Sequence, residues 1–245
     1  MSVLILKNIV SEGPGTLGDF LRGSGIDCRI IELEHERIPD ADRYETLVML
    51  GGPMSVNNEK EYPYLTEEIR LAERFMKEGR KVFGICLGSQ IMAKALGARV
   101  YAGPIKELGW FDIQLSEKGL DDAHMRSLAR STETGEILQS VRVFHWHGET
   151  FDLPVGAELL AGSALYPHQA FRYGEQAYAF QFHIEVSKEM IAEWALTEPV
   201  DRDLLRRQTE VMYSGFFEHA RGFYHSFFAS GRTLDERRLT QGGEI

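Results

Sequence analysis

The first half of the chain alternates short apolar runs with longer segments in which apolar residues recur every three or four positions. The short runs predict strands at 3–9, 28–33, 46–50 and 81–85, and the recurring spacing predicts helices at 16–22 and 62–77. The run at 46–50 has no charged residue, which is typical of a strand in a parallel sheet covered on both faces. This alternation predicts an α/β fold with an open, mostly parallel, flavodoxin-like sheet and helices on both faces.

After residue 99 the pattern changes to short strands separated by turns, with few helical segments. Strands are expected at 100–103, 109–115, 138–146, 157–162, 170–173 and 177–182. We interpret them as a small antiparallel addition to the sheet, followed by a return to its centre. No repeat or linker divides the chain, so a single domain is expected over residues 1–198.

A C-terminal helical extension is expected over residues 199–245, with its helix at about 201–230. Apolar residues recur there at helical spacing: Met212, Phe216, Ala220, Phe223 and Phe227. Such an aromatic stripe indicates packing against the domain or against a partner subunit, and it could hold a homo-oligomer together. A cofactor-binding role for the stripe is less favoured.

Composition narrows the classes of function. The 245 residues are 43% hydrophobic and 26% charged, as in globular proteins, and the net charge of -10 argues against a general nucleic-acid binder. No apolar run is long enough to span a bilayer, and the N-terminus begins as a strand without signal-peptide features, so we expect a cytoplasmic protein. With only Cys28 and Cys86, neither a disulfide framework nor a cysteine-based zinc site is expected.

Cys86 stands where the apolar run at 81–85 changes to a helical pattern. Gly84 and Gly88 flank it, as glycines do in a strand-to-helix nucleophile elbow, where they allow a tight turn and the close approach of a substrate. The N-terminal end of the following helix favours a negative charge on the sulfur. A buried cysteine can instead act as a small hydrophobic residue, but a core position does not need two glycines and a polar Gln90 around it. We therefore interpret Cys86 as a candidate nucleophile.

His183 and Glu185 follow the strand expected at 177–182. Residues two apart face the same side of a strand, so Glu185 can orient the imidazole of His183 and stabilise its protonated form. A cysteine nucleophile normally has a histidine base within reach, and that base needs an orienting group. Two polar residues at a strand end are common, so this pair gains weight only together with Cys86.

These motifs resemble those of the class I, or triad-type, glutamine amidotransferases. The segment Gly84-Ile85-Cys86-Leu87-Gly88-Ser89-Gln90 is similar to the family's Gly-x-Cys-x-Gly-x-Gln, and 183–185 is similar to its His-x-Glu, with Ile184 where most members have proline. Gly51-Gly52-Pro53 resembles the family's oxyanion loop, although alone it would indicate only a turn. The resemblance spans about residues 3–186. It implies that the amides of Gly52 and Leu87 stabilise an oxyanion and that Gln90 contacts the glutamyl part of the substrate.

Within that family, the chain looks most like the free-standing group similar to the glutaminase domain of GMP synthase. Segments 107–110 and 144–149 are similar to internal signatures of that group, which implies that His145, Trp146 and His147 line the glutamine site. His145 and His147 face the same way on a strand and could also bind a metal, but no third ligand is apparent. We therefore expect neither a metal nor an organic cofactor.

The predicted reaction is cleavage of the glutamine side-chain amide, or of a related γ-glutamyl amide, through a γ-glutamyl thioester on Cys86 that releases ammonia or an amine. Synthetases of this family use the ammonia in a second domain, for which the residues after the triad leave no visible room. Three alternatives stay open: a glutaminase subunit serving a separate synthase, a stand-alone γ-glutamyl peptidase or hydrolase, and a non-catalytic binding or regulatory module that retains the site. Elbow-cysteine proteins with protease or chaperone-like activity are less favoured, because their histidine usually follows the cysteine directly, where this chain has Leu87.

Overall fold

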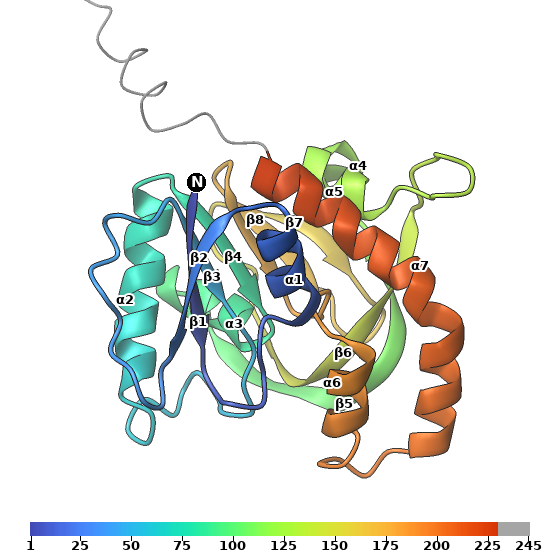
Figure 1. Ribbon diagram of the computed structural model, residues 1–245, viewed down its shortest axis with the longest axis horizontal. Coiled ribbons are helices and arrows are strands. Elements are labelled where there is room, and N and C mark those ends of the chain that lie inside the picture. Colours follow the sequence, from blue (N-terminus) through green and yellow to red (C-terminus); the bar gives the residue numbers. More distant parts are fainter. Residues whose placement is uncertain (230–245) are drawn as a thin grey trace, which may run out of the picture.

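A nine-stranded sheet runs through the centre of the protein, whose computed structural model describes residues 1–229 (Figure 1). The strands are β1 (Ser2–Lys7), β2 (Asp27–Glu32), β3 (Thr46–Met49), β4 (Lys81–Ile85), β5 (Val100–Leu115), β6 (Ser140–Phe151), β7 (Ala157–Gly162), β8 (Ala170–Tyr173) and β9 (Ala177–Phe180). The helices are α1 (Gly15–Gly23), α2 (Tyr64–Lys77), α3 (Leu87–Ala95), α4 (Glu117–Asp121), α5 (Ala123–Leu128), α6 (Lys188–Trp194) and α7 (Arg202–Ala229). Residues 230–245, part of the expected C-terminal extension, lie outside the described residues.

The sheet has two halves that differ in strand direction. Its order is β2-β1-β3-β4-β9-β8-β7-β5-β6; the strands from β2 to β9 pair in parallel, and those from β9 to β6 pair antiparallel. α1 connects β1 to β2 and α2 connects β3 to β4, as parallel crossovers commonly do, whereas a loop without a helix joins β2 to β3 and a short turn joins β8 to β9. The predicted α/β fold with an open parallel sheet and an antiparallel addition is confirmed.

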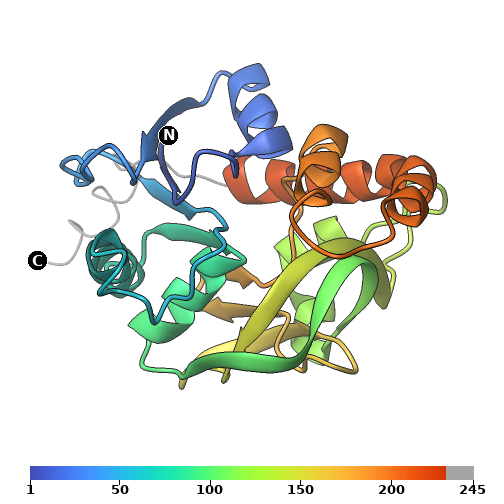
Figure 2. The ribbon, with the colours of Figure 1, turned by 90° about the horizontal axis from the view of Figure 1, so that it is seen from below.

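Side chains alternate along the parallel strands between two hydrophobic layers. In β1, Val3 and Ile5 belong to the layer that includes α1 and α7, whereas Leu4 and Leu6 belong to the layer that includes α2 and α3. All four are fully buried, as expected for a strand covered on both faces. Figure 2 shows α1, α6 and α7 on one side of the sheet and α2 and α3 on the other.

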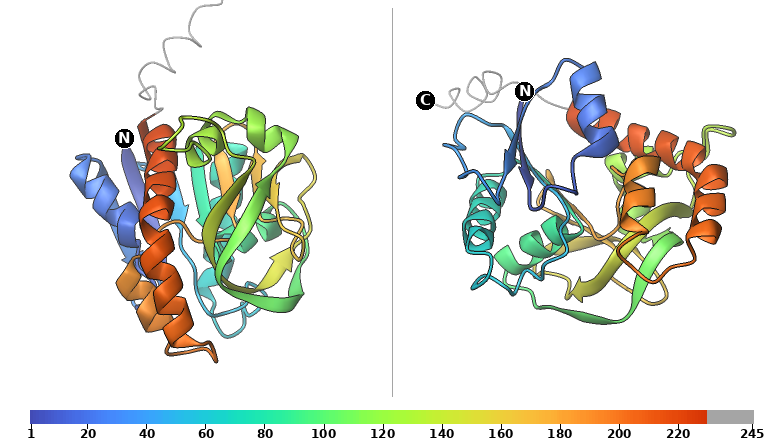
Figure 3. Two further views of the ribbon diagram at one scale, coloured as in Figure 1. Left: turned by 90° about the vertical axis from the view of Figure 1, so that its right-hand side faces the viewer. Right: turned by 60° about the horizontal axis from the view of Figure 1, so that its bottom comes forward.

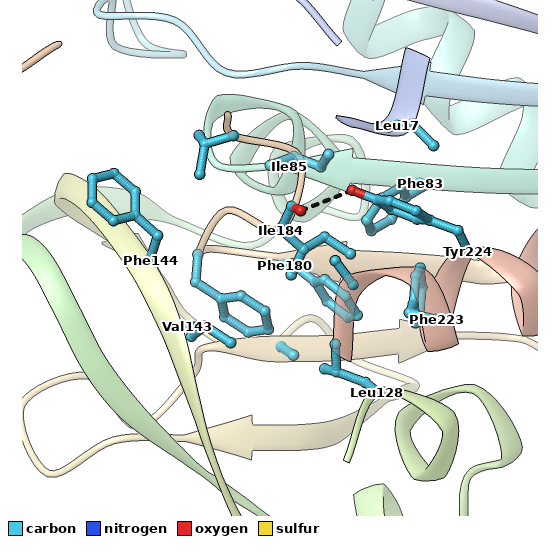
Figure 4. Close-up of a cluster of buried hydrophobic side chains, with 14 of the residues drawn as sticks. Leu17, Phe83, Ile85, Leu128, Val143, Phe144, Phe180, Ile184, Phe223 and Tyr224 are labelled. Carbon is cyan, nitrogen blue, oxygen red and sulfur yellow. Dashed lines mark hydrogen bonds between the residues drawn. The ribbon is translucent and has the colours of Figure 1, made fainter. Parts of the chain in front are cut away.

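The aromatic stripe of α7 packs against the sheet. Phe223 and Phe227 are fully buried, and their ring centroids lie 5.1 and 5.8 Å from that of Phe83 in β4. Tyr224, between them in the sequence, donates a hydrogen bond from its hydroxyl to the carbonyl oxygen of Ile184 at 2.8 Å (Figure 4). The last described helix therefore contacts the segment that carries the predicted histidine and glutamate.

The strand β5 differs from the sequence-based prediction. Two short strands were expected between 100 and 115, but β5 is continuous and forms a long curved pair with β6 (Figure 3). The pairing register shifts between Ala102 and Glu107, in the region of Gly103 and Pro104. Glycine and proline are weak strand formers, which explains why the pattern gave no strand signal there. The short helices α4, α5 and α6, with five to seven residues each, also went unpredicted because they show little helical periodicity.

Within residues 1–229, no helix combines the length and the apolar composition that crossing a membrane requires.

Candidate active site

Cys86 occupies a strained turn between β4 and α3. Its φ angle is 51°, and it is the one non-glycine residue with positive φ among those that the structure describes. Its backbone N–H donates to the carbonyl oxygen of Phe180 at 2.8 Å, which ties the turn to the end of β9. A side chain in this backbone region costs free energy, and such strain is concentrated at functional sites. The geometry is that of the predicted nucleophile elbow.

The two glycines of the elbow are required by close packing. A Cβ atom at Gly84 would lie 2.5 Å from the carbonyl oxygen of Gly88, and one at Gly88 would lie 2.2 Å from the carbonyl oxygen of Met49. Both distances are shorter than real Cβ contacts, and both obstacles are backbone atoms that cannot rotate away. Larger residues at either position would push α3 away from the sheet and displace Cys86.

His183 is oriented by Glu185, as the sequence predicted. The Nδ1 atom of His183 lies 2.7 Å from Oε1 of Glu185, whose other oxygen accepts from the Ile184 N–H at 3.0 Å. Because a carboxylate accepts, Nδ1 is the donor, and Nε2 is the nitrogen left to exchange a proton. That Nε2 atom is buried and makes no hydrogen bond within residues 1–229. Although burial opposes the charged form, the charges of Glu185 and the Cys86 thiolate raise the pKa of His183 well above its usual value.

Helices on the α7 side of the sheet hold the segment that bears His183 and Glu185. Thr16, at the start of α1, donates from its backbone N–H at 2.8 Å and from its hydroxyl at 3.1 Å to the carbonyl oxygen of Glu185. Tyr224 of α7 donates to the carbonyl oxygen between the two residues, that of Ile184 (Figure 4). These bonds fix the backbone of the segment that follows β9. They thereby fix the direction of the His183 and Glu185 side chains.

A cleft of about 690 Å³ opens over the elbow. Six of the residues singled out in the sequence line it: Gly52, Cys86, Gln90, Trp146, His147 and His183. Leu87 is buried as the first residue of α3, where helix amides have no intrahelical acceptor. The structure does not bring His145 to the cleft, because its side chain is fully buried beside His147 and Glu107.

Gly52 lies beside the side chain of Leu87 at the elbow. A Cβ atom at Gly52 would be 3.0 Å from Cδ2 of Leu87, and one at the neighbouring Gly51 would be 3.6 Å from Cβ of Cys86. The loop after β3 therefore runs directly past the sulfur-bearing residue. The two segments whose amides the family resemblance assigns to the oxyanion site therefore lie next to each other.

Gln90 is linked to Cys86 through Gln181, a residue that the sequence analysis missed. Its Nε2 donates to Oε1 of Gln181 at 3.2 Å, and Nε2 of Gln181 lies 3.8 Å from Sγ of Cys86. Gln181 stands two residues before His183, so strand alternation alone could have placed it on the same side. On the other side of the sulfur, the carbonyl oxygen of Trp146 is also 3.8 Å from Sγ.

Glu12 is the second missed residue. It lies in the loop after β1 and lines the cleft, and its carboxyl group makes no hydrogen bond or ion pair with any of residues 1–229. A Cβ atom at Gly51 would lie 2.5 Å from Oε2 of Glu12 and 3.3 Å from Cε1 of His183, so the carboxyl group faces the catalytic end of the cleft. Burial raises the pKa of Glu12 to about 7; the charge of His183 opposes this shift and that of Glu185 adds to it. Its position beyond the carboxyl end of a parallel strand was the available signal.

A cluster of potential metal ligands corrects one expectation of the sequence analysis. We expected no third ligand for His145 and His147, but Glu107 of β5 places Oε2 at 3.1 Å from Nδ1 of His145 and at 3.1 Å from Nε2 of His147. All three side chains are buried. Burial lowers the pKa of His145 to about 4, so this imidazole is neutral near pH 7.

A family profile described as glutamine amidotransferase class-I matches residues 9–193, a span that contains the elbow, the oxyanion loop and the His-x-Glu segment. The chain belongs to the class I glutamine amidotransferase family. The resemblance inferred from the motifs is thereby confirmed.

Individual relatives agree with this assignment. The chain is 36% identical over 156 residues to the glutamine amidotransferase-like protein YfeJ of Salmonella typhimurium, a match that covers 62% of each protein. It is 31% identical over 143 residues to a glutamine-hydrolyzing GMP synthase of Janthinobacterium, covering 58% of this chain and 25% of that enzyme. The chain thus spans under two thirds of these curated relatives. Among solved structures, a glutamine amidotransferase from Thermotoga maritima superposes with a TM-score of 0.81 at 30% identity, covering 94% of this chain and 99% of that one.

Proposed function

We propose that this class I glutamine amidotransferase cleaves γ-glutamyl amides with Cys86 as the nucleophile. The observation that supports this most is the pairing of a strained elbow cysteine with a histidine that has one nitrogen bound to Glu185 and the other unpartnered within residues 1–229. A core cysteine needs neither the positive φ nor the oriented base. Cys86 and His183 both line the cleft, so a substrate can reach them.

In the first half of the proposed reaction, Nε2 of His183 takes the proton of the Cys86 thiol, and the sulfur attacks the side-chain amide carbon. The carbonyl oxygen becomes an oxyanion, which the N–H groups of Gly52 and Leu87 stabilise. When the tetrahedral intermediate collapses, the C–N bond breaks and His183 gives its proton to the departing nitrogen. The products are ammonia or an amine and a γ-glutamyl thioester on Cys86.

In the second half, water enters the place of the amine. His183 removes a proton from this water as it attacks the thioester carbonyl, and the same amides stabilise the second oxyanion. The C–S bond then breaks and the sulfur leaves as a thiolate, which restores Cys86 and the imidazolium of His183. Glu185 stays ionised throughout and keeps the imidazole in its productive orientation.

The size of the cleft favours a leaving group larger than ammonia. A volume of about 690 Å³ falls in the range of pockets that enclose drug-sized ligands, and glutamine alone would leave much of it unfilled. A stand-alone γ-glutamyl hydrolase or peptidase is therefore our second candidate. The GMP synthase relatives suggest another role, that of a glutaminase that passes ammonia to a separate synthase. The part of the Janthinobacterium synthase that matches this chain is 25% of that enzyme.

The test is to measure glutamate release from glutamine, γ-glutamyl peptides and γ-glutamyl amines by wild-type protein and by Cys86→Ala. We expect at least one substrate to be hydrolysed by the wild type, and its rate to fall by a factor of at least about 10³ in the variant. Cys28→Ala is the matched control, since Cys28 is the other free cysteine and lies outside the cleft. Equal rates for wild type and Cys86→Ala would refute the proposal.

A further inference from the structure

The cluster of Glu107, His145 and His147 has no part in the proposed reaction, yet its atoms converge as a ligand set does. The two distances to Oε2 of Glu107 are both 3.1 Å, and Nδ1 of His145 lies 3.4 Å from Nε2 of His147. Zinc bonds of about 2.0–2.1 Å at tetrahedral angles put neighbouring ligand atoms about 3.3 Å apart. The three atoms are thus spaced as if around one ion.

The tautomer of His147 places a lone pair where a metal ion would bind. Its Nδ1 lies 3.1 Å from the carbonyl oxygen of Glu149, and a carbonyl can only accept, so Nδ1 carries the hydrogen. In a neutral ring, Nε2 then points a lone pair at the carboxylate oxygen of Glu107. Two acceptors at 3.1 Å repel unless a proton or a metal ion lies between them, and the third nitrogen, from His145, converges on the same place.

Two of the three side chains, His147 and Glu107, have the outer partners that metal ligands have, whereas Nε2 of His145 is buried without one within residues 1–229. The bond from His147 to a backbone carbonyl is the kind that fixes the tautomer of a ligating histidine. Glu107 is held by hydrogen bonds to its two oxygens, from Gln169 Nε2 at 2.7 Å and from Ser163 Oγ at 3.4 Å. A ligating carboxylate is commonly supported in this way.

We propose that Glu107, His145 and His147 bind one divalent transition-metal ion, with Zn²⁺ as the best fit. Two imidazole nitrogens and one carboxylate oxygen are a donor set for zinc, whereas Mg²⁺ and Ca²⁺ prefer oxygen ligands. The ion links β5 to β6, because Glu107 and His147 are register partners across these strands. His147 also lines the cleft, so the fourth position is open to a water molecule from that side.

The inferred site fixes the wall of the cleft next to the nucleophile. Trp146, between the two histidines, lines the cleft with its side chain and has its carbonyl oxygen 3.8 Å from Sγ of Cys86. An ion that pins both neighbours of Trp146 would hold this carbonyl in place. The role is structural, and metal binding does not depend on the proposed hydrolysis.

The experiment measures metal binding directly on the full chain. Protein freed of metal with a chelator is titrated with Zn²⁺ and with Co²⁺, with metal content read by mass spectrometry and cobalt geometry by its visible absorption. We expect one ion per chain, cobalt bands of a four-coordinate site, and a higher unfolding temperature with Zn²⁺. Glu107→Gln should weaken binding at least tenfold, while His168→Asn, which removes a half-buried histidine outside the cluster, should leave it unchanged.

A second variant, His145→Asn, covers the case in which Glu107→Gln fails to fold. The proposal is overturned if the wild type retains no more metal than these variants, because the cluster is then held by protons alone, with His147 as an imidazolium ion. It is equally overturned if wild type and folded variants bind one ion with the same affinity, since the metal then sits elsewhere.

Discussion

His183 and His147 each form a hydrogen bond through Nδ1, but the surroundings of their Nε2 atoms differ. His183 donates from Nδ1 to Glu185 at 2.7 Å, and His147 donates from Nδ1 to the carbonyl oxygen of Glu149 at 3.1 Å. Within residues 1–229, Nε2 of His183 has no partner, whereas Nε2 of His147 lies 3.1 Å from Glu107. Both rings are buried and each has one fixed tautomer.

The difference shows how the surroundings of one atom decide what a buried imidazole can do. An oriented ring with a free nitrogen at a cleft can take up and release a proton, which is the work of a general base. The same ring with its second nitrogen facing a carboxylate and another imidazole is suited to hold a cation in place. In both arrangements the paired residues are two positions apart, His183 and Glu185 after the end of β9 and His145 and His147 within β6.

The largest expected effect comes from removing the charge that orients His183. Glu185→Gln should lower kcat by a factor of about 10²–10⁴, because the amide cannot stabilise the imidazolium and can favour the wrong tautomer. Glu189→Gln, on the exposed first turn of α6, removes the same charge nearby and should change kcat less than twofold. Steady-state kinetics on a cleaved γ-glutamyl substrate would measure both. A Glu185→Gln enzyme with wild-type kcat would mean that His183 needs no orienting carboxylate.

A smaller effect should follow when the backbone support of His183 is weakened. Tyr224→Phe leaves the carbonyl oxygen of Ile184 without the bond from α7 and should lower the free energy of unfolding by about 1–3 kcal/mol. Tyr213→Phe removes a similar bond, to Val186, from a half-buried residue, and should cost less. Denaturant unfolding of both variants gives the comparison. If Tyr224→Phe leaves the free energy of unfolding unchanged, the bond from α7 to Ile184 does not stabilise the triad segment.

The smallest expected effect is on the pH dependence of kcat/KM. Burial raises the pKa of Glu12 to about 7, so its carboxyl group is protonated below that pH and charged above it. Since the charge faces His183, its appearance should change kcat/KM several-fold between pH 6 and 8. Glu12→Gln should remove this titration and leave a flatter profile over that range. An unchanged profile would show that Glu12 does not act on the base.

The same pKa also determines whether stability rises or falls with pH. Folded Glu12 holds its proton up to about pH 7, whereas the unfolded chain releases it near the usual value of 4.5. The folded state therefore binds more protons between these values, and the stability of the wild type should fall as pH rises from about 4.5 to 7. Glu12→Gln should lack this decline, which thermal unfolding at pH 5 and pH 7.5 would reveal.

The sequence allowed prediction of those features whose parts are close together in the chain. The elbow is a run of seven residues, and its glycines follow from contacts inside that run and with β3. His183 and Glu185 are two residues apart, so the period of a strand was enough to pair them. The open sheet with its antiparallel addition followed from the alternation of elements.

Features that depend on register between distant strands could not be predicted. Glu107 and His147 are forty residues apart and meet only because β5 continues past a register shift that Gly103 and Pro104 obscure. Glu12 and Gly51 come from loops after different strands, and their approach depends on packing at one end of the sheet. Tyr224 lies 40 residues from Ile184, and only the fold of α7 brings them together.

Covalent labelling of Cys86 tests the central claim most directly. A glutamine analogue with an electrophilic chloroketone in place of the side-chain amide is incubated with the protein, and the modified residue is identified by peptide mass spectrometry. Cys28 is the internal control, because it is half-buried, lies outside the cleft, and has a pKa raised by burial. We predict one label per chain, on Cys86, that excess γ-glutamyl substrate slows and His183→Ala abolishes. Equal labelling of Cys28 and Cys86, or labelling of Cys86 that is indifferent to substrate and to His183, would contradict the account.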